Sequence, residues 1–470
     1  MGALRTRPVS ARPRFTTALF VLVLTAVVAV ALVGASASSA AGAASHPMSV
    51  NPEMARIAGK PGPAAQHFSC QDRPIDGSQG LKCYGPAQIQ AAYGYSGLLS
   101  SGIDGKGKTI VIIDAFANPF LAGPTGDLAL EDAAFDLPDP PSFTVLQKPN
   151  PAPAFDINDP AQFNFASEET LDVEWAHVMA PGAKIVLAEA ASNEDTDLLA
   201  TTKYVIDHHI GDVISQSFGE AETCMDPALL AEQHALFARA VSKGYTLLAG
   251  SGDSGAAQFS CDGNGAIEAA ATPASDPNVT SIGGTTLNAD GETGAYIGET
   301  TWTELPTIGC NPPALDLPFD VNCSGGGFST IYRRPSWQAS QVKHDGRGVP
   351  DVAFSAGVNG GVLTVCSVCD GGPPAFFLFG GTSVGPPTWS GLVVDTDQMA
   401  HHDIGDINRV LYQIGQSSHR RADLHDVTVG NNDVAEIGGA GFEAREGWDP
   451  VTGLGTPNAA NLLPELAKRH

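Results

Sequence analysis

The chain has little positive charge: 25 Lys and Arg residues stand against 51 Asp and Glu residues, for a formal net charge of −26. This balance disfavours nucleic acid as a partner, because binding to phosphate backbones depends on clusters of Lys and Arg. An excess of carboxylates suits a protein that works in acid, where many of them are protonated. It suits simple solubility equally well.

Long hydrophobic runs are also scarce. The single candidate extends from Ala18 to Val33, and its 16 residues are few for a membrane span. Arginines precede this run and small residues follow it, so residues 1–44 have the layout of a secretory signal peptide. An uncleaved membrane anchor is the alternative. We expect a secreted, extracellular protein, without membrane contact after signal cleavage, that acts as a monomer.

The 8 cysteines fall into pairs that are close in sequence, and export to an oxidising compartment favours disulfides. Proximity predicts sequential pairing: Cys70 with Cys83, Cys224 with Cys261, Cys310 with Cys323, and Cys366 with Cys369. The last pair also has the spacing of a redox or zinc motif. No second Cys or His pair accompanies it at suitable spacing, so a staple within one loop is the better interpretation.

Residues 45–83 are expected to form a short leader tied by a disulfide, and residues 84–467 one large domain without internal repeats. From Tyr84 onward, β-type runs alternate with helical runs. This alternation predicts an α/β fold with a mostly parallel central sheet and helices on both faces. Predicted strands are Thr109–Asp114, Lys184–Ala188, Val213–Ser217, Tyr245–Ala249 and Phe376–Phe379; predicted helices are Leu171–Met179, Leu198–His208, Pro227–Lys243 and Pro386–Ala400.

Substrate sites in such folds lie at the carboxyl ends of the strands, where this chain has a small-residue turn, Gly380-Gly381-Thr382-Ser383. A helix that starts with Pro386 follows the turn, so Ser383 is expected near the free amides of a helix N-terminus. Such amides favour the negative charge of a tetrahedral intermediate. Ser383 is therefore a candidate nucleophile, although the turn taken alone also suits an ordinary loop.

A serine nucleophile needs a base, and the chain lacks the His-Gly-Thr-His segment that supplies one in subtilisin-like enzymes. His177, His208 and His209 lie in helical runs and are interpreted as packing or surface residues. Glu168 and Asp172 are better candidates, because residues four apart share one helix face and like charges that close raise one pKa. A solvated acidic helix face is the alternative.

A third carboxyl group, that of Asp253, stands in the glycine-rich turn Gly252-Asp253-Ser254-Gly255. Aspartate in a turn commonly bonds its own backbone. In a site held at low pH, a protonated Asp253 is instead able to donate a hydrogen bond to an oxyanion.

These motifs occur in an order that resembles the sedolisins, or serine-carboxyl peptidases. The resemblance implies a subtilisin-like fold, with Ser383 as nucleophile and Glu168 as general base. It also implies that Asp172 orients Glu168 and shares its proton, and that Asp253 donates to the oxyanion. Further matching motifs are Pro273-Ala274-Ser275-Asp276-Pro277, Gly283-Gly284-Thr285, Ser324-Gly325-Gly326-Gly327-Phe328-Ser329, Pro350-Asp351-Val352, Gly447-Trp448-Asp449-Pro450 and Thr452-Gly453-Leu454-Gly455.

The resemblance further implies a calcium ion near the C-terminus. Matched by position, its ligands are the side chains of Asp426 and Asp449 and the backbone carbonyls of Val427, Arg445 and Gly447. Oxygen ligands of this kind are those that calcium prefers. A turn without metal is the alternative.

Three departures from the family pattern stand out. The leader is much shorter than the usual sedolisin propeptide, which makes self-activation by propeptide removal doubtful. Phe218 stands where many relatives have Trp, and Asp114 stands where some have Glu. The expected function is a secreted, acid-acting endopeptidase that cleaves proteins or peptides. The alternatives are a weak or inactive sedolisin-fold protein that binds peptides or cell-surface material, and a neutral subtilisin with a histidine near Ser383.

Overall fold

The computed structural model describes residues 45–50, 53–59, 67–303 and 322–469 of the 470-residue chain. The predicted signal peptide and Cys310 lie outside the described residues.

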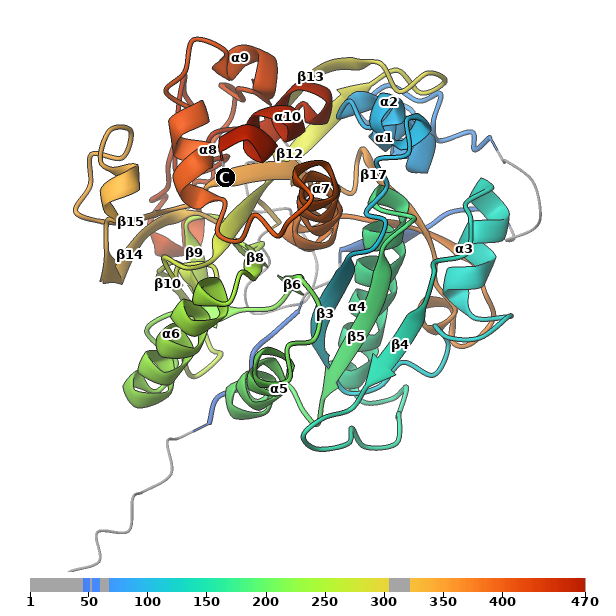
Figure 1. Ribbon diagram of the computed structural model, residues 1–470, viewed down its shortest axis with the longest axis horizontal. Helices are drawn as coiled ribbons and strands as arrows, with labels where there is room; N and C mark the ends of the chain where they lie inside the picture. The colour runs from blue at the N-terminus through green and yellow to red at the C-terminus, as the bar shows by residue number, and fades with distance from the viewer. Residues whose placement is uncertain (1–44, 51–52, 60–66, 304–321, 470) are drawn as a thin grey trace, which may run out of the picture. The chain divides into compact units, whose positions relative to one another are not determined.

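The centre of the fold is an eight-stranded sheet. Its strands are β3 (Thr109–Ala115), β4 (Phe143–Leu146), β5 (Lys184–Ala190), β6 (Val213–Gln216), β8 (Thr246–Gly250), β12 (Thr280–Ala289), β13 (Tyr296–Thr301) and β16 (Val352–Ser355). They run in the order β13-β12-β8-β6-β3-β5-β4, with β16 paired to β12 (Figure 1). Only the pair of β12 with β13 is antiparallel, so the prediction of a mostly parallel sheet is confirmed.

Helices cover both faces of this sheet, and the side chains of β3 show why (Figure 1). Ile110 and Ile112 pack in one core with α4 (Pro160–Met179), α7 (Gly385–Ala400) and α10 (Ala459–Arg469). Val111 and Ile113 point to the opposite face, where they pack with α5 (Asp195–Asp207) and α6 (Pro227–Ser242). Both faces of the strand are therefore apolar, as a buried parallel sheet requires.

The predicted helix Leu171–Met179 is only the second half of α4, which already begins at Pro160. Asp159 starts it: its Oδ1 accepts hydrogen bonds from the backbone N–H groups of Ala161 at 3.0 Å and Gln162 at 3.4 Å. The polar stretch that follows hid this first half, because its buried carboxyls interrupt the apolar period. As a result Glu168 and Asp172 lie in the middle of a continuous helix.

Strand β18 (Phe376–Phe379) has the predicted bounds, but its place in the alternating parallel sheet was predicted wrongly. It belongs to a separate four-stranded sheet of order β1-β18-β17-β2, with β1 (Met54–Arg56), β17 (Gly361–Val365) and β2 (Cys83–Tyr84). Strand β18 is antiparallel to both of its neighbours. An apolar run shows that a strand is buried but not which strand it pairs with.

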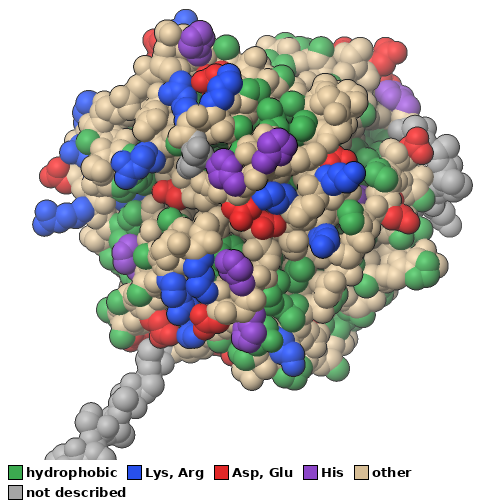
Figure 2. All heavy atoms as spheres, viewed as in Figure 1, with side chains coloured by type: hydrophobic (Ala, Val, Ile, Leu, Met, Phe, Trp, Pro, Cys, Tyr) green, Lys and Arg blue, Asp and Glu red, His purple; other side chains and the backbone are tan. Residues whose placement is uncertain are grey.

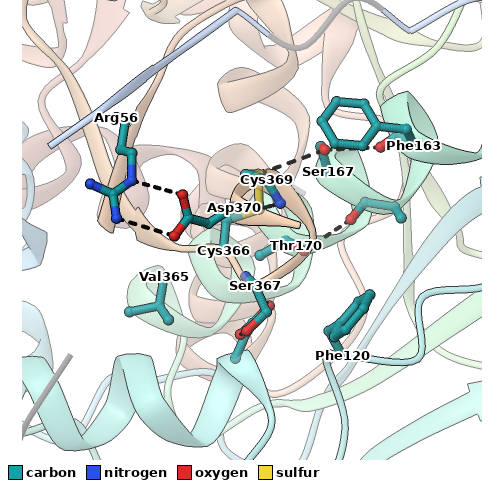
Figure 3. Close-up of a disulfide and its surroundings, with 12 residues drawn as sticks. Arg56, Phe120, Phe163, Ser167, Thr170, Val365, Cys366, Ser367, Cys369 and Asp370 are labelled. Atoms are coloured by element: carbon teal, nitrogen blue, oxygen red, sulfur yellow. Dashed lines mark hydrogen bonds and ion pairs between the residues drawn. A yellow bond between two sulfur atoms is a disulfide. The ribbon is translucent and has the colours of Figure 1, made fainter. Parts of the chain in front are cut away.

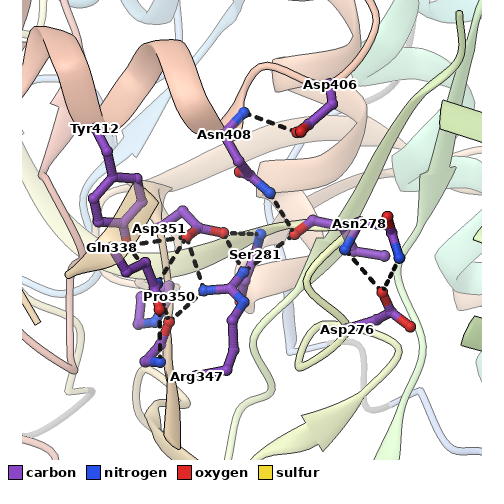
Figure 4. Close-up of polar contacts among 12 residues, drawn as sticks. Asp276, Asn278, Ser281, Gln338, Arg347, Pro350, Asp351, Asp406, Asn408 and Tyr412 are labelled. Atoms are coloured by element: carbon purple, nitrogen blue, oxygen red, sulfur yellow. Dashed lines mark hydrogen bonds and ion pairs between the residues drawn. The ribbon is translucent and has the colours of Figure 1, made fainter. Parts of the chain in front are cut away.

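A buried ion pair fixes the loop that follows β15 (Gly346–Val349) (Figure 4). The guanidinium of Arg347 donates to Asp351 at 2.9 Å, and both side chains are fully buried. Asp351 also accepts from the hydroxyl of Tyr412 at 3.0 Å and from the backbone N–H of Ser281 at 2.9 Å. Every charge in this group has a partner, which is the condition under which a buried ion pair is tolerated.

Three of the predicted disulfides are formed by described residues: Cys70–Cys83, Cys224–Cys261 and Cys366–Cys369. The last is a staple within one loop, and Figure 3 shows this loop against α4. There the Sγ atom of Cys369 lies 3.7 Å from the Oγ atom of Ser167, the residue before Glu168. The staple therefore supports the part of α4 that carries the candidate base.

Within the described ranges, no helix is both long and apolar enough to cross a bilayer. On the face shown in Figure 2, acidic and basic side chains are interspersed with uncharged ones.

Candidate active site

Ser383 lies in a short 3₁₀ turn, Thr382–Val384, between β18 and the first turn of α7. The preceding Gly381 has φ +92°, a conformation that favours glycine. A Cβ atom there would also come within 2.8 Å of Asp253 Oδ2. The glycine thus lets the serine turn lie directly against the Asp253 turn.

Glu168 projects from α4 toward this turn and is fully buried. Burial raises its pKa well above the usual value, and the nearby charge of Asp172 raises it further, whereas the hydroxyl of Ser383 lowers it. Neither carboxylate oxygen of Glu168 has a hydrogen-bond partner among the described residues, so Glu168 faces the serine without being hydrogen-bonded to it.

Asp172, one helical turn further along α4, is also fully buried and is held by Ser217. The Ser217 hydroxyl lies 3.0 and 2.8 Å from the two carboxylate oxygens and 3.4 Å from the carbonyl oxygen of Ser383. Burial raises the pKa of Asp172, and the Ser217 hydroxyl opposes this shift. Ser217 therefore links the second carboxyl to the nucleophile turn, a role that the sequence alone did not indicate.

Asp114, near the carboxyl end of β3, extends the carboxyl group cluster. It is fully buried, and within the described part of the chain neither of its oxygens has a hydrogen-bond partner. Burial is the main cause of its raised pKa, followed by the charges of Asp172, Glu169 and Glu168. Asp114, Glu168 and Asp172 are called the site cluster below. Because these three carboxyl groups are buried and their charges repel one another, they cannot all be ionised at the same time.

Asp253 follows β8 and reaches the serine turn from the other side. Its Oδ1 atom accepts from the backbone N–H of Thr382 at 2.8 Å and from the Thr382 hydroxyl at 2.7 Å. The same hydroxyl accepts from the backbone N–H of Gly252 at 3.1 Å. Burial raises the pKa of Asp253 to about 6, so this carboxyl is protonated in mild acid.

The cleft at Ser383 contains no histidine among its described lining residues, which are Ser49, Val50, Ser217, Phe218, Gly219, Gly250, Gly252, Asp253, Ser254, Gln258, Phe259, Ala271, Thr382 and Ser383. His177 is buried on α4, where its Nε2 atom lies 2.8 Å from the carbonyl oxygen of Pro138. His208 and His209 are exposed. The interpretation of these three histidines as packing or surface residues agrees with their positions.

The leader enters the same cleft, which the sequence did not reveal. Ser49 and Gly219 exchange two backbone hydrogen bonds, of 3.0 and 3.1 Å, in an antiparallel bridge. Val50 lines the cleft together with Ser383. Further along, the carbonyl of Glu53 accepts from the backbone N–H of Gly380 at 2.8 Å, and β1 then pairs with β18. The described leader residues thus contact the cleft at Gly219 and again at Gly380, next to the Ser383 turn.

The predicted calcium ligands are near one another. The backbone N–H of Gly447 lies 3.2 Å from both carboxylate oxygens of Asp426, and that of Arg445 lies 3.2 Å from Asp449 Oδ2. Both carboxyls therefore flank one loop. Asp449 is fully buried, and Asp426 is paired with Arg420 at 2.7 Å.

The donor set of this loop fits a hard cation. Backbone carbonyls of Val427, Arg445 and Gly447 accept no backbone hydrogen bond from the described residues, which leaves their lone pairs for a ligand. The described ranges contain no cluster of three or more His, Cys, Asp or Glu side chains suited to a metal. A site here would depend on two carboxylates plus carbonyls, which is a calcium-type set rather than a zinc-type set.

The sheet order and the serine facing buried carboxyls define a subtilisin-like α/β fold with a serine-carboxyl site. No protein-family model matches the chain. The solved structure of Pseudomonas sedolisin, a serine-carboxyl proteinase complexed with two molecules of pseudo-iodotyrostatin, superimposes with a TM-score of 0.68 at 26% identity. The match covers 83% of this chain and 99% of that structure.

Curated relatives agree with this result. Kumamolisin of Bacillus sp. (strain MN-32) is 33% identical over 396 residues, or 82% of this chain and 63% of kumamolisin. Sedolisin of Pseudomonas sp. (strain 101) is 32% identical over 281 residues, covering 59% and 44% of the two chains. Tripeptidyl-peptidase 1 of Canis lupus familiaris is 29% identical over 333 residues, covering 64% and 52%. The chain belongs to the sedolisin family, and it spans less than two thirds of the length of these relatives.

Proposed function

We propose that this protein is a secreted, acid-acting endopeptidase that hydrolyses peptide bonds through an acyl-serine intermediate. The observation that carries the proposal is the position of Glu168, a buried carboxylate without a hydrogen-bond partner among the described residues, facing the hydroxyl of Ser383. The described lining of the cleft offers no imidazole in its place. A carboxylate still accepts a proton in acid, where histidine is already charged.

The proposed reaction begins when Ser383 Oγ attacks the substrate carbonyl carbon and its proton passes to Glu168. Protonated Asp253 donates a hydrogen bond to the resulting oxyanion. When the C–N bond breaks, Glu168 returns the proton to the leaving amine. Water then attacks the acyl-serine, with Glu168 again taking a proton and giving it to Ser383 Oγ. Asp172 orients Glu168 and shares its proton within the site cluster.

Endopeptidase action is supported by the course of the leader. Its residues Ser49 and Val50 line the cleft, and Glu53 and β1 contact Gly380 and β18 next to the Ser383 turn. A chain can therefore extend along the cleft past the nucleophile turn, whereas removal of short N-terminal peptides requires one side to be closed.

Calcium at Asp426 and Asp449 is part of the proposal, on the strength of the oxygen-rich loop described above. The ion would hold together the segments around Asp426, which directly follows β19 (Leu424–His425), and Asp449, and would take no part in the reaction.

A peptide-binding protein without activity is the second candidate, and the occupation of the cleft by the leader is the observation that favours it. Hydrolysis of a denatured protein between pH 3 and 8, with wild type and Ser383→Ala side by side, separates the two. We expect hydrolysis with an optimum below neutrality, abolished in Ser383→Ala with an unchanged melting temperature. Equal rates in both proteins would exclude the serine mechanism, and no hydrolysis by either would favour the binding protein.

A further inference from the structure

Next to the cleft at Ser383 lies a second cavity of about 410 Å³, and the leader residues His46, Pro47 and Ser49 form part of its lining. Gln258 and Phe259 border both hollows. The disulfide Cys224–Cys261 forms part of the wall of the second one. The disulfide ties the two chain segments of this wall together covalently.

The leader binds between two backbone segments, as a peptide substrate binds by strand addition. On one side Ser49 pairs with Gly219; on the other, Met48 N–H donates to the carbonyl of Asn193 at 2.8 Å. The carbonyl of His46 accepts from the backbone N–H of Asp195 at 2.9 Å. These contacts are between backbone groups, so any extended peptide is able to make them.

Among the leader side chains, His46 places both ring nitrogens near acceptors of the cavity wall. Its Nδ1 atom lies 2.6 Å from Glu220 Oε2, and its Nε2 atom lies 2.9 Å from the carbonyl oxygen of Cys261. Both neighbours are acceptors, an arrangement that favours the doubly protonated, cationic ring.

Glu220 is buried, with only 7% of its surface exposed, and it lines the cavity. Neither of its carboxylate oxygens has a hydrogen-bond partner among the described residues, although Oε2 lies at ion-pair distance from His46. A buried carboxylate with one cationic partner loses much of its stabilisation when that partner leaves. When the leader is displaced, Glu220 therefore favours a new cation from the incoming peptide.

We propose that Glu220, with the carbonyl of Cys261, forms a subsite that selects a basic side chain in the peptide substrate. The selected residue lies on the amino-terminal side of the cleaved bond, three positions before the residue that pairs with Gly219, as His46 lies before Ser49. The inference rests on the proposed function for its kinetic test and is independent of it for its binding test.

The kinetic test uses quenched fluorescent peptides that begin Ser-X-Pro-Met-Ser-Val and share one C-terminal extension, with X as Lys, Arg, Gln or Glu. Wild type is expected to hydrolyse the Lys and Arg peptides with kcat/KM about tenfold or more above the Gln peptide, because a hydrogen bond to a charged group is worth more than a neutral one. Glu220→Gln should bring the ratio to about one. Glu232→Gln, on the exposed surface of α6, is the matched control and should leave it unchanged.

The preference should also depend on pH. Burial raises the pKa of Glu220 to about 7, and His46, Asp195 and Glu194 are the titratable groups that face it. Glu220 ionises as pH rises, so the ratio of Lys to Gln should be larger at pH 6 than at pH 4. In the Glu220→Gln variant, the ratio of Lys to Gln should be the same at pH 6 and pH 4. A purely structural role for Glu220 would not explain a pH-dependent ratio that is present in wild type and absent in this variant.

The binding test uses the full chain carrying Ser383→Ala and His46→Gln, so that no hydrolysis occurs and the leader has lost its cation. Fluorescent Ser-X-Pro-Met-Ser-Val peptides are titrated by anisotropy. Tighter binding of Lys than of Gln, lost on adding Glu220→Gln, supports the subsite even if wild type proves inactive. Equal binding of the Lys and Gln peptides, or a preference that survives Glu220→Gln, overturns it. The comparison of the Lys and Gln peptides is made on one and the same protein. It therefore tests the subsite even if the Glu220→Gln variant does not fold.

Discussion

Helix α4 contributes residues to two groups of buried carboxyls, and the groups that neighbour these two clusters differ. The site cluster faces Ser383, whereas Glu174 meets Asp127 and Glu131 of α3 (Asp127–Phe135) in what we call the structural cluster. In the structural cluster, the backbone N–H of Val365 lies 3.1 Å from carboxylate oxygens of both Glu131 and Glu174. In the site cluster, Glu168 and Asp114 have no such donor among the described residues.

Both clusters consist of carboxyls whose pKa is raised by burial. What distinguishes them is the neighbouring group: a backbone segment in one case and the hydroxyl of Ser383, the proposed nucleophile, in the other. A raised pKa alone therefore does not identify a catalytic residue. The predictions below test whether chemistry and stability divide between the clusters as this geometry indicates.

The largest difference should be in activity. Glu168→Gln is expected to lower kcat about 10²- to 10⁴-fold, the usual contribution of a general base, with little change in melting temperature. Glu174→Gln, six residues along the same helix, should keep activity within about twofold. The measurement is hydrolysis of a denatured protein at the optimum pH. Equal losses in both variants would mean that the clusters do not differ in function.

Asp253 should have the next largest effect. Asp253→Ala is expected to lose roughly a hundredfold in rate, since it removes one oxyanion donor. The wild-type profile should be bell-shaped: protonation of Glu168 limits the acid side, and loss of the Asp253 proton, with a pKa of about 6, limits the other.

Asp253→Asn keeps a donor that needs no proton, so its rate should fall less steeply above pH 6 than that of wild type. Profiles of kcat/KM from pH 3 to 8 measure both limbs. A wild-type optimum at pH 8, or near-normal activity of Asp253→Ala, would contradict the proposed role.

These residues show most clearly which features of the site could be predicted from the sequence. The four-residue spacing correctly placed Glu168 and Asp172 on one helix face, and the glycine turns placed Asp253 and Ser383 after strands. These inferences succeeded because spacing and turn chemistry act over a few residues. The roles themselves remain predictions until the variants are measured.

Contacts between distant segments were missed. Ser217 ends a predicted strand, but its position did not indicate that it contacts both Asp172 and Ser383, although it lies 45 residues beyond Asp172. The structural cluster draws on two helices and a strand, and none of its carboxyls was singled out from the sequence. The leader pairs with Gly219 across 170 residues. Nothing in local composition encodes such pairings, because they depend on how whole layers pack.

The structural cluster should govern stability against pH. Burial raises the pKa of Asp127 to about 6 although Ser367 donates to it, so the neutral form is favoured by folding. A raised folded-state pKa contributes stability in acid that is lost as pH rises through about 6. In wild type, a pKa raised by about two units changes the free energy of unfolding by on the order of 3 kcal/mol between acid and neutral pH. Asp127→Asn should remove this change.

Urea unfolding at pH 4, 5.5 and 7 measures the effect. Wild type should be most stable at pH 4, and the curve of Asp127→Asn should be flatter. A wild type that gains stability between pH 4 and 7 would show that these carboxyls are not buried as described.

Calcium should have the smallest effect of the four, and one confined to stability. A strong chelator is expected to lower the melting temperature by roughly 3–8 °C, because the ion binds only the folded loop. Asp449→Asn should melt lower and no longer respond to chelator. An unchanged melting curve for wild type, with metal shown to be absent, would remove the calcium proposal.

The leader has one more consequence, which concerns concentration. Because Ser49 belongs to the same chain as Gly219, it competes with substrate at a fixed local concentration on the order of millimolar for a short tether. Dilution changes the encounter rate with substrate but not with the leader. Two preparations that differ a hundredfold in protein concentration should therefore show the same degree of self-occupation. Only a cut in the tether, or a peptide that outcompetes it, would change the fraction of open clefts.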